Sequence, residues 1–199
     1  MKKPKILCFA GSARKASFNK LLAKVALAEL SKVGAEAIFI DWADYDIPLY
    51  NEDDLSTNGF PKAVLELKEL FKGSDGFLIS SPEYNSSLSP LLKNAIDWIS
   101  ISLPDEPPLS LTCFKGKSAG LLAASPGGLG GLRGLFHLRD ILQNIGVTVV
   151  PEMFALSYAF SAFDESGNLK DAHSISKVAQ VASDLATLAL NSKGQYATP

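Results

Sequence analysis

The sequence has few cysteines, no long apolar run and no surplus of positive charge. Cys8 and Cys113 stand alone, without a CxxC spacing or a neighbouring histidine, which argues against a metal or dithiol redox site. No run approaches the roughly 18 apolar residues that a membrane span requires. The formal net charge is −2, whereas dedicated nucleic-acid binders usually carry a basic surplus. We therefore expect no nucleic acid, no membrane span and no metal.

The amino terminus also lacks the marks of a signal peptide. Met-Lys-Lys-Pro-Lys leads directly into a short apolar run, with no longer apolar core and no small-residue cleavage site, so a cytoplasmic protein is expected. Apolar residues make up 47% of the 199 positions, and no repeat or linker divides them, so residues 1–199 are expected to form a single domain. Cys8 is expected in the core, whereas Cys113 could be a surface thiol.

Short apolar runs alternate with segments of helical periodicity. The expected strands are residues 5–10, 37–40, 76–80, 118–124 and 148–150, with 153–156 as a further piece separated by Pro151. The expected helices are residues 19–33, 61–71, 90–101, 133–145 and 172–190, with a long loop after residue 41 and a frayed tail over 191–199. Strands that are apolar throughout and alternate with helices predict an α/β fold, with a parallel sheet covered on both faces.

An anion site is predicted where the first strand meets the first helix. Gly11 is followed by Ser12, Arg14, Ser17 and Asn19, whose hydroxyl, guanidinium and amide groups all donate hydrogen bonds. A helix N-terminus adds free N–H groups and the positive end of the helix dipole, and an arginine adds a charge-assisted bond. The alternative is that Ser17 or Asn19 serves only as a helix cap.

Two common nucleotide motifs are missing. The chain has no GxxxxGK[ST], which argues against a P-loop NTPase, and the first loop has no GxGxxG. Asp41 ends the second strand about where a dinucleotide's ribose is bound, but the glycines that admit the pyrophosphate are absent. A ligand with one phosphate, a mononucleotide, fits these residues better.

The loop after the third strand carries Pro82, Glu83, Tyr84 and Asn85. Proline stiffens the turn, tyrosine can stack on a planar heterocycle, and asparagine offers both a donor and an acceptor. Glu83 could instead hold the loop together without touching a ligand. The structural alternative is an ordinary turn in which Ser87 or Ser89 caps the next helix.

The loop after the fourth strand contains Ser125, Gly127 and Gly128, and five glycines fall within residues 127–134. Glycines let the backbone approach a ligand closely, although a flexible linker is the alternative. In an open parallel sheet, ligands bind outside the carboxyl ends of the strands. The three loops are therefore expected to surround one site.

Together these segments resemble the NADPH-dependent FMN reductases of the flavodoxin-like superfamily, which include quinone, azo-dye and chromate reductases. The resemblance rests on residues 11–19, on Pro82-Glu83-Tyr84-Asn85 with residues 92–98, on residues 125–133 and on Pro48-Leu49-Tyr50-Asn51. One departure is Ser89-Pro90, where many members have Pro-Gly.

The resemblance implies a three-layer sandwich with a five-stranded parallel sheet in the order 2-1-3-4-5. It implies FMN as cofactor and NADPH or NADH as co-substrate, and a homodimer or homotetramer. The implied cofactor-binding residues are Ser12, Arg14, Ser17, Phe18 and Asn19 around the phosphate, and Pro82, Glu83, Tyr84, Asn85, Ser125, Gly127 and Gly128 around the ring.

A flavin carries the hydride chemistry itself, so no catalytic side chain is expected. The predicted reaction is a ping-pong transfer from NAD(P)H through FMN to a small-molecule acceptor such as a quinone or free flavin. Two alternatives stay open: a flavodoxin-type electron carrier, which is usually more acidic than this chain, and a sensor or interaction domain without FMN. Five polar residues of the later helices are assigned to packing or subunit contact: Lys93, Asn94, Asp97, His137 and Arg139.

Overall fold

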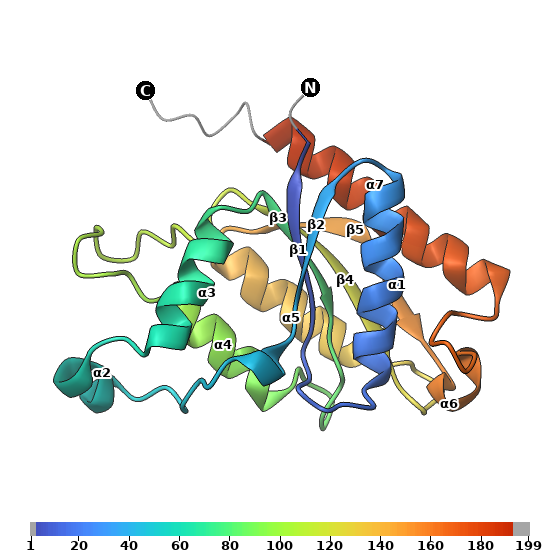
Figure 1. Ribbon diagram of the computed structural model, residues 1–199, viewed down its shortest axis with the longest axis horizontal. Coiled ribbons are helices and arrows are strands. Elements are labelled where there is room, and N and C mark those ends of the chain that lie inside the picture. Colours follow the sequence, from blue (N-terminus) through green and yellow to red (C-terminus); the bar gives the residue numbers. More distant parts are fainter. Residues whose placement is uncertain (1–2, 193–199) are drawn as a thin grey trace.

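The computed structural model describes residues 3–192 as a parallel sheet covered by helices (Figure 1). The strands are β1 (Lys5–Ala10), β2 (Glu36–Ile40), β3 (Gly76–Ser80), β4 (Ser118–Ala124) and β5 (Thr148–Leu156). Their order is β2-β1-β3-β4-β5, and every neighbouring pair is parallel. This confirms the predicted α/β fold and strand order.

Helices cover both faces of the sheet. The helical segments of the chain are α1 (Phe18–Lys32), the 3-10 turn η1 (Trp42–Asp44), α2 (Glu52–Asn58), α3 (Lys62–Lys72), α4 (Pro90–Ser100), α5 (Leu132–Asn144), α6 (Ala159–Ala162) and α7 (Ala172–Ser192). One core lies between the sheet and α1 with α7, and the other between the sheet and α3, α4 and α5. No helix within residues 3–192 combines the length and apolarity needed to cross a membrane.

The alternation of side chains along β1 shows why the strands are apolar throughout. Ile6 and Cys8 point into the core beneath α1 and α7, whereas Leu7 and Phe9 point into the core beneath α3, α4 and α5. All four are at least 98% buried. Because both faces are covered, the interior positions of the strand, from Ile6 to Ala10, are all apolar. The expected core position of Cys8 is confirmed.

Two helical segments in the expected loop after β2 were not predicted, η1 and α2. Asn51 caps α2 by accepting a hydrogen bond from the Asp53 N–H at 2.9 Å, and acidic residues fill its first turn. Such residues stabilise a helix through its cap and dipole. However, α2 buries none of its residues, and in Figure 1 it stands apart from the sheet. The sequence therefore carries no apolar periodicity there.

Three other expectations need correction. Pro151 does not split the last strand: β5 is continuous, with a register shift opposite β4 that absorbs the proline. Cys113 is 1% exposed and is therefore not a surface thiol. Helix α7 runs to Ser192, so the first two residues of the expected tail are helical; the rest of that tail, residues 193–199, lies outside the described residues. The short helix α6 was not predicted.

Two buried lysines bind the carbonyl groups at the C-termini of helices α3 and α4. These termini lie at the edge of the sheet opposite the carboxyl ends of the strands. Lys68 donates to the carbonyl oxygens of Ile99, at 2.8 Å, and Ile101, and Lys117 donates to those of Phe71, at 2.8 Å, and Ser74. Each ammonium satisfies the carbonyls that a helix C-terminus leaves unpaired. Burial lowers the pKa of Lys68, and it lowers that of Lys117 to about 8.

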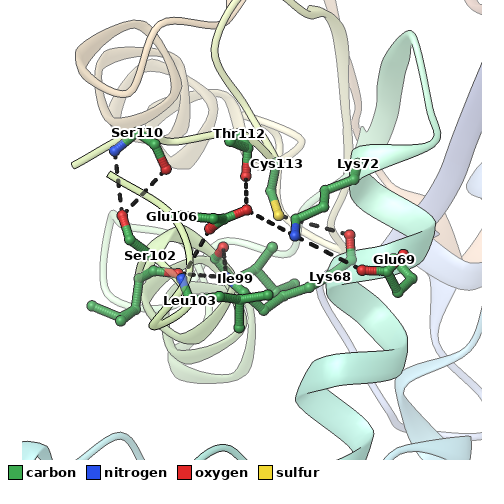
Figure 2. A network of polar contacts seen from close by, with 11 residues as sticks. Lys68, Glu69, Lys72, Ile99, Ser102, Leu103, Glu106, Ser110, Thr112 and Cys113 are labelled. Carbon is green, nitrogen blue, oxygen red and sulfur yellow. Dashed lines mark hydrogen bonds and ion pairs between the residues drawn. The ribbon is translucent and has the colours of Figure 1, made fainter. Parts of the chain in front are cut away.

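The carboxylate of Glu106 organises the long connection between α4 and β4, as Figure 2 shows. It pairs with Lys72 at 2.8 Å and accepts hydrogen bonds from the Leu103 N–H at 2.9 Å and the Thr112 hydroxyl at 2.8 Å. Desolvation raises its pKa, but the bonds from Lys72, Leu103 and Thr112 outweigh this and lower the pKa to about 2.

We predict that Glu106→Gln lowers the free energy of unfolding at pH 7 by about 1–2 kcal/mol, because a charge-assisted network is lost. Since the folded-state pKa lies below the unfolded value, this stability is present above about pH 4.5 and is lost as the pH falls towards 2. Urea unfolding of both proteins at several pH values measures the difference. A penalty that stays constant down to pH 2.5 would contradict this assignment.

In the loop after β4, packing requires a glycine at position 130 but not at position 127. Gly130 has φ +63°, and a Cβ there would lie 2.7 Å from the carbonyl carbon and oxygen of Ala155. The nearest neighbour of a Cβ at Gly127 would be the Ser125 hydroxyl at 3.8 Å. This part of the loop is therefore fixed against β5, which argues against a flexible linker.

We predict that Gly130→Ala lowers the free energy of unfolding by about 2–4 kcal/mol, through left-handed strain and a clash with the β5 backbone. The matched control Gly127→Ala should stay within about 0.5 kcal/mol of the parent, because its space is open. Chemical denaturation of the FMN-free proteins compares them. Equal stabilities for the two variants would show that the close approach at Gly130 is unimportant.

Candidate functional site

A cleft of about 370 Å³ lies at the carboxyl edge of the sheet, where the loops after β1, β3 and β4 meet. Nine of the twelve predicted site residues line it: Ser12, Arg14, Ser17, Phe18, Asn19, Pro82, Glu83, Tyr84 and Ser125. Ala16, Ala124, Pro126 and Phe160 complete the lining. The remaining three predicted residues, Asn85, Gly127 and Gly128, do not line it.

The phosphate loop, residues 11–17, places several free donors at the start of α1. The Ser17 oxygen caps the helix by accepting from the Lys20 N–H at 3.4 Å, which leaves its hydroxyl proton available. The first N–H groups of α1 have no intrahelical acceptor. The Arg14 side chain is exposed and forms no hydrogen bond or ion pair with any other residue between 3 and 192. These groups together suit an anion.

Asn19 holds the strand ends in place instead of presenting its whole amide to the cleft. Its Nδ2 donates to the Ala124 carbonyl at 2.9 Å, and its Oδ1 accepts from the Ala124 N–H and the Ser80 hydroxyl, both at 2.9 Å. The residue is only 3% exposed. One N–H of the carboxamide remains for any ligand, so the principal role of this side chain is to join α1 to β3 and β4.

Lys20 is a site-forming residue that sequence reasoning missed. Its buried ammonium donates to the Ala13 carbonyl at 3.0 Å and forms an ion pair with Asp41 at 2.6 Å, which ties the phosphate loop to the end of β2. Desolvation raises the Asp41 pKa, but the hydrogen bond from Lys20 and its charge lower it overall. Asp41 is therefore engaged by a lysine and is not free to bind a ribose, as the missing GxGxxG already suggested.

The Tyr84 loop, residues 81–87, ends in a tight turn. Tyr84 and Ser87 exchange two backbone hydrogen bonds, at 2.9 and 3.1 Å, and Asn85 and Ser86 have φ of +50° and +66°. Two consecutive left-handed residues define a type I′ turn, which tolerates asparagine well. Asn85 thus lies at the tip of the turn, while Tyr84 is about half exposed and faces the cleft.

The carboxylate of Glu83 is bound by the start of α5. Oε1 accepts from Arg133, with Nε at 2.9 Å, and Oε2 accepts from the Gly134 N–H at 3.1 Å. Burial raises the pKa of Glu83, but the bonds from Arg133 and Gly134 lower it overall. Glu83 therefore stays ionised, and it bonds to protein, as its possible role in holding the loop had suggested.

The third wall comes from the loop after β4 and from α6. Ser125 accepts at its hydroxyl from the Gly127 N–H at 3.3 Å, and its carbonyl accepts from the Ala159 N–H at 3.1 Å. These bonds fix α6 beside the cleft, where the Phe160 ring contacts Phe18 edge to face, with ring centroids 5.1 Å apart. No sequence pattern had indicated Phe160, because a four-residue helix shows no periodicity.

The later polar residues that resemblance singled out lie outside the cleft. Asn94 accepts from the Tyr50 N–H at 2.8 Å and donates to the Pro48 carbonyl at 2.9 Å, so it fixes the loop after β2. Lys93 and Asp97 form an exposed ion pair within α4 at 2.7 Å. Ser89 caps α4, and Pro90 occupies its first turn, so the Ser89-Pro90 departure produces an ordinary helix start.

The chain matches known proteins over most of its length. The sequence profile of the NADPH-dependent FMN reductases matches residues 4–161. An NAD(P)H-dependent FMN reductase of Pseudomonas aeruginosa is 41% identical over 170 residues, covering 84% of this chain and 85% of that one. A quinone reductase of Escherichia coli (strain K12) is 39% identical over 150 residues, covering 74% of each chain.

The fold is also found among solved structures. The flavoenzyme NAD(P)H:(acceptor) oxidoreductase FerB of Paracoccus denitrificans superposes with a TM-score of 0.79 at 27% identity, covering 94% of this chain and 98% of that one. These matches agree with the fold, the cofactor and the oxidoreductase class that the sequence motifs predicted. The chain therefore belongs to the NADPH-dependent FMN reductase family.

Proposed function

We propose that the protein binds FMN in the cleft and passes hydride from NAD(P)H to a quinone, a free flavin or a similar small acceptor by a ping-pong mechanism. The observation that carries this proposal is the convergence in one cleft of an anion-binding helix start and the Tyr84 loop. FMN supplies the redox chemistry when bound, and the protein binds it, orients it and tunes it.

The donor set of the cleft fits FMN. A single phosphate needs several N–H and O–H donors and benefits from one cation. The Ser17 hydroxyl proton, the start of α1 and the Arg14 guanidinium, which pairs with none of residues 3–192, provide them. Gly127 leaves open space where any other residue would place a Cβ. A planar ring can then lie between the Tyr84 loop and Ser125, both of which line the cleft.

The residues of the cleft divide into two groups in this proposal. Ser12, Arg14, Ser17 and the first N–H groups of α1 hold the phosphate, with Phe18 packed beside them. Pro82, Tyr84 and Ser125 contact the ring system, together with backbone atoms around Asn85, Gly127 and Gly128. Asn19, Lys20 and Glu83 hold the surrounding loops in position, because their polar atoms bond to protein.

The size of the cleft supports alternate binding of the two substrates. About 370 Å³ is near the lower end of the range of small-molecule sites, about 300–1,000 Å³. In this proposal FMN occupies the cleft, and NAD(P)H and the acceptor use the same exposed face of its ring in turn. A ping-pong order follows from this shared space.

The assembly and the compartment also belong to the proposal. Exposed apolar side chains, Tyr84 and Phe160, line the cleft and suit cover by a second copy in a homodimer or homotetramer. Cys8 and Cys113 are both free thiols, as is usual in the reducing cytoplasm. We propose that residues 1–199 act there as one FMN-binding domain.

We predict that Arg14→Ala weakens FMN binding about ten- to hundredfold, because one charge-assisted bond to the phosphate is lost. Lys15→Ala is the matched control: it removes the same charge from the next residue, which does not line the cleft. Titration of the FMN-free proteins, followed by quenching of FMN fluorescence, gives both dissociation constants. Equal losses in the two variants would indicate a general charge effect and would contradict the phosphate assignment.

We further predict that NADPH bleaches the bound flavin under anaerobic conditions before any acceptor is added, and that initial rates with a benzoquinone give parallel double-reciprocal lines. Both follow if donor and acceptor occupy the same space in turn. Stopped-flow absorbance and steady-state assays measure them. Intersecting lines would exclude the ping-pong order, and a flavin that dithionite reduces but NADPH does not would point to an electron carrier.

A further inference from the structure

The start of helix α5 lacks a cap of its own. Its N-cap residue is Gly131, which has φ +94° and no side chain to accept a hydrogen bond, and the first turn contains no acidic residue. An uncapped helix start leaves N–H groups unpaired and its positive dipole end uncompensated. Water or a partner from elsewhere in the chain must therefore satisfy these groups.

Glu83 of the Tyr84 loop supplies that partner. Its carboxylate accepts from the Gly134 N–H at 3.1 Å, the donor that a capping side chain would normally satisfy, and from the Arg133 guanidinium, with Nε at 2.9 Å. The carboxylate side chain is only 8% exposed. Both of its oxygens are thus bonded to α5, and the charge is paired.

The surrounding contacts bring the loop and the helix unusually close. A Cβ on Gly134 would lie 3.1 Å from the Ser87 carbonyl oxygen, so a larger residue would push the loop away. The Ser87 hydroxyl also lies 3.2 Å from Nδ1 of His137, one turn further along α5. The two ends of the tight turn, Glu83 and Ser87, are therefore both attached to the same helix.

We propose that Glu83 is a positioning residue: it fixes the Tyr84 loop to the start of α5, and its ion pair with Arg133 sets the reduction potential of the flavin. The first half stands on the contacts above alone. The second half rests on the proposed function, because it requires FMN in the cleft that Glu83 lines.

The proposed effect of the ion pair on the reduction potential follows from charge balance. Reduction adds negative charge to a flavin, so an unpaired cation near the ring favours reduction and an unpaired anion opposes it. In the native protein the charges of Glu83 and Arg133 offset one another. Removing either partner should therefore shift the potential, and the two shifts should have opposite signs. A role confined to packing would not produce that sign reversal.

The attachment is tested on the FMN-free protein by hydrogen exchange. In Glu83→Ala, the Gly134 amide should exchange about tenfold faster, because its acceptor is gone. The control is Glu152→Ala, which breaks the ion pair with Lys177, 2.8 Å long, between β5 and α7. Unchanged exchange at Gly134 in Glu83→Ala, or equal acceleration in both variants, would overturn the attachment.

The tuning is tested by redox titration of the FMN-loaded proteins. Glu83→Gln should raise the midpoint potential of the flavin, Arg133→Gln should lower it, and the double variant should return towards the parent value. Glu152→Gln and Lys177→Gln should leave it unchanged. Shifts of the same sign in both single variants, or none, would overturn the electrostatic role. If the parent protein bound no FMN, the proposed function would fail while the exchange experiment would still decide the attachment.

Discussion

The buried carboxamide of Asn19 is the contact on which the cleft depends. It links the start of α1, just after the phosphate loop, to Ala124 at the end of β4 and to Ser80 at the end of β3, so one side chain joins an element that borders each of the three loops. An amide satisfied on both its oxygen and its nitrogen in a dry interior has strong geometric preferences. The positions of the phosphate loop, the Tyr84 loop and the loop after β4 are thereby fixed relative to one another.

Sequence patterns were enough to predict a parallel sheet and most of the residues that line the cleft, whereas the strand order was implied by the family resemblance. Strands buried on both faces are mostly apolar, and the helices expected over residues 90–101 and 133–145 begin and end within one residue of α4 and α5. Donors such as Arg14 and Ser17 lie beside a helix start, where local spacing alone brings them together. The family resemblance then related these residues to FMN.

What could not be predicted depends on contacts between distant residues. Asn19 and Ser17 look alike as hydrogen-bond donors in the sequence, and only the fold shows that Asn19 bonds to the ends of β3 and β4 whereas Ser17 caps its own helix. Lys20 looks like an ordinary charged helix residue until Asp41 is brought against it. Helices α2 and α6 are too short to show an apolar stripe: the Asn51 cap stabilises α2, and the buried Ala159 with its hydrogen bond to Ser125 holds α6.

The capping of α5 by Glu83 also bears on how the chain folds. Glu83 and Gly134 are 51 positions apart, and β3, α4 and β4 must be in place before they meet. Long-range contacts of this kind form after the entropy of closing the intervening loop has been overcome. The first turn of α5 should therefore become ordered together with the tertiary fold and not as an isolated helix start, because its acceptor is supplied by a distant loop.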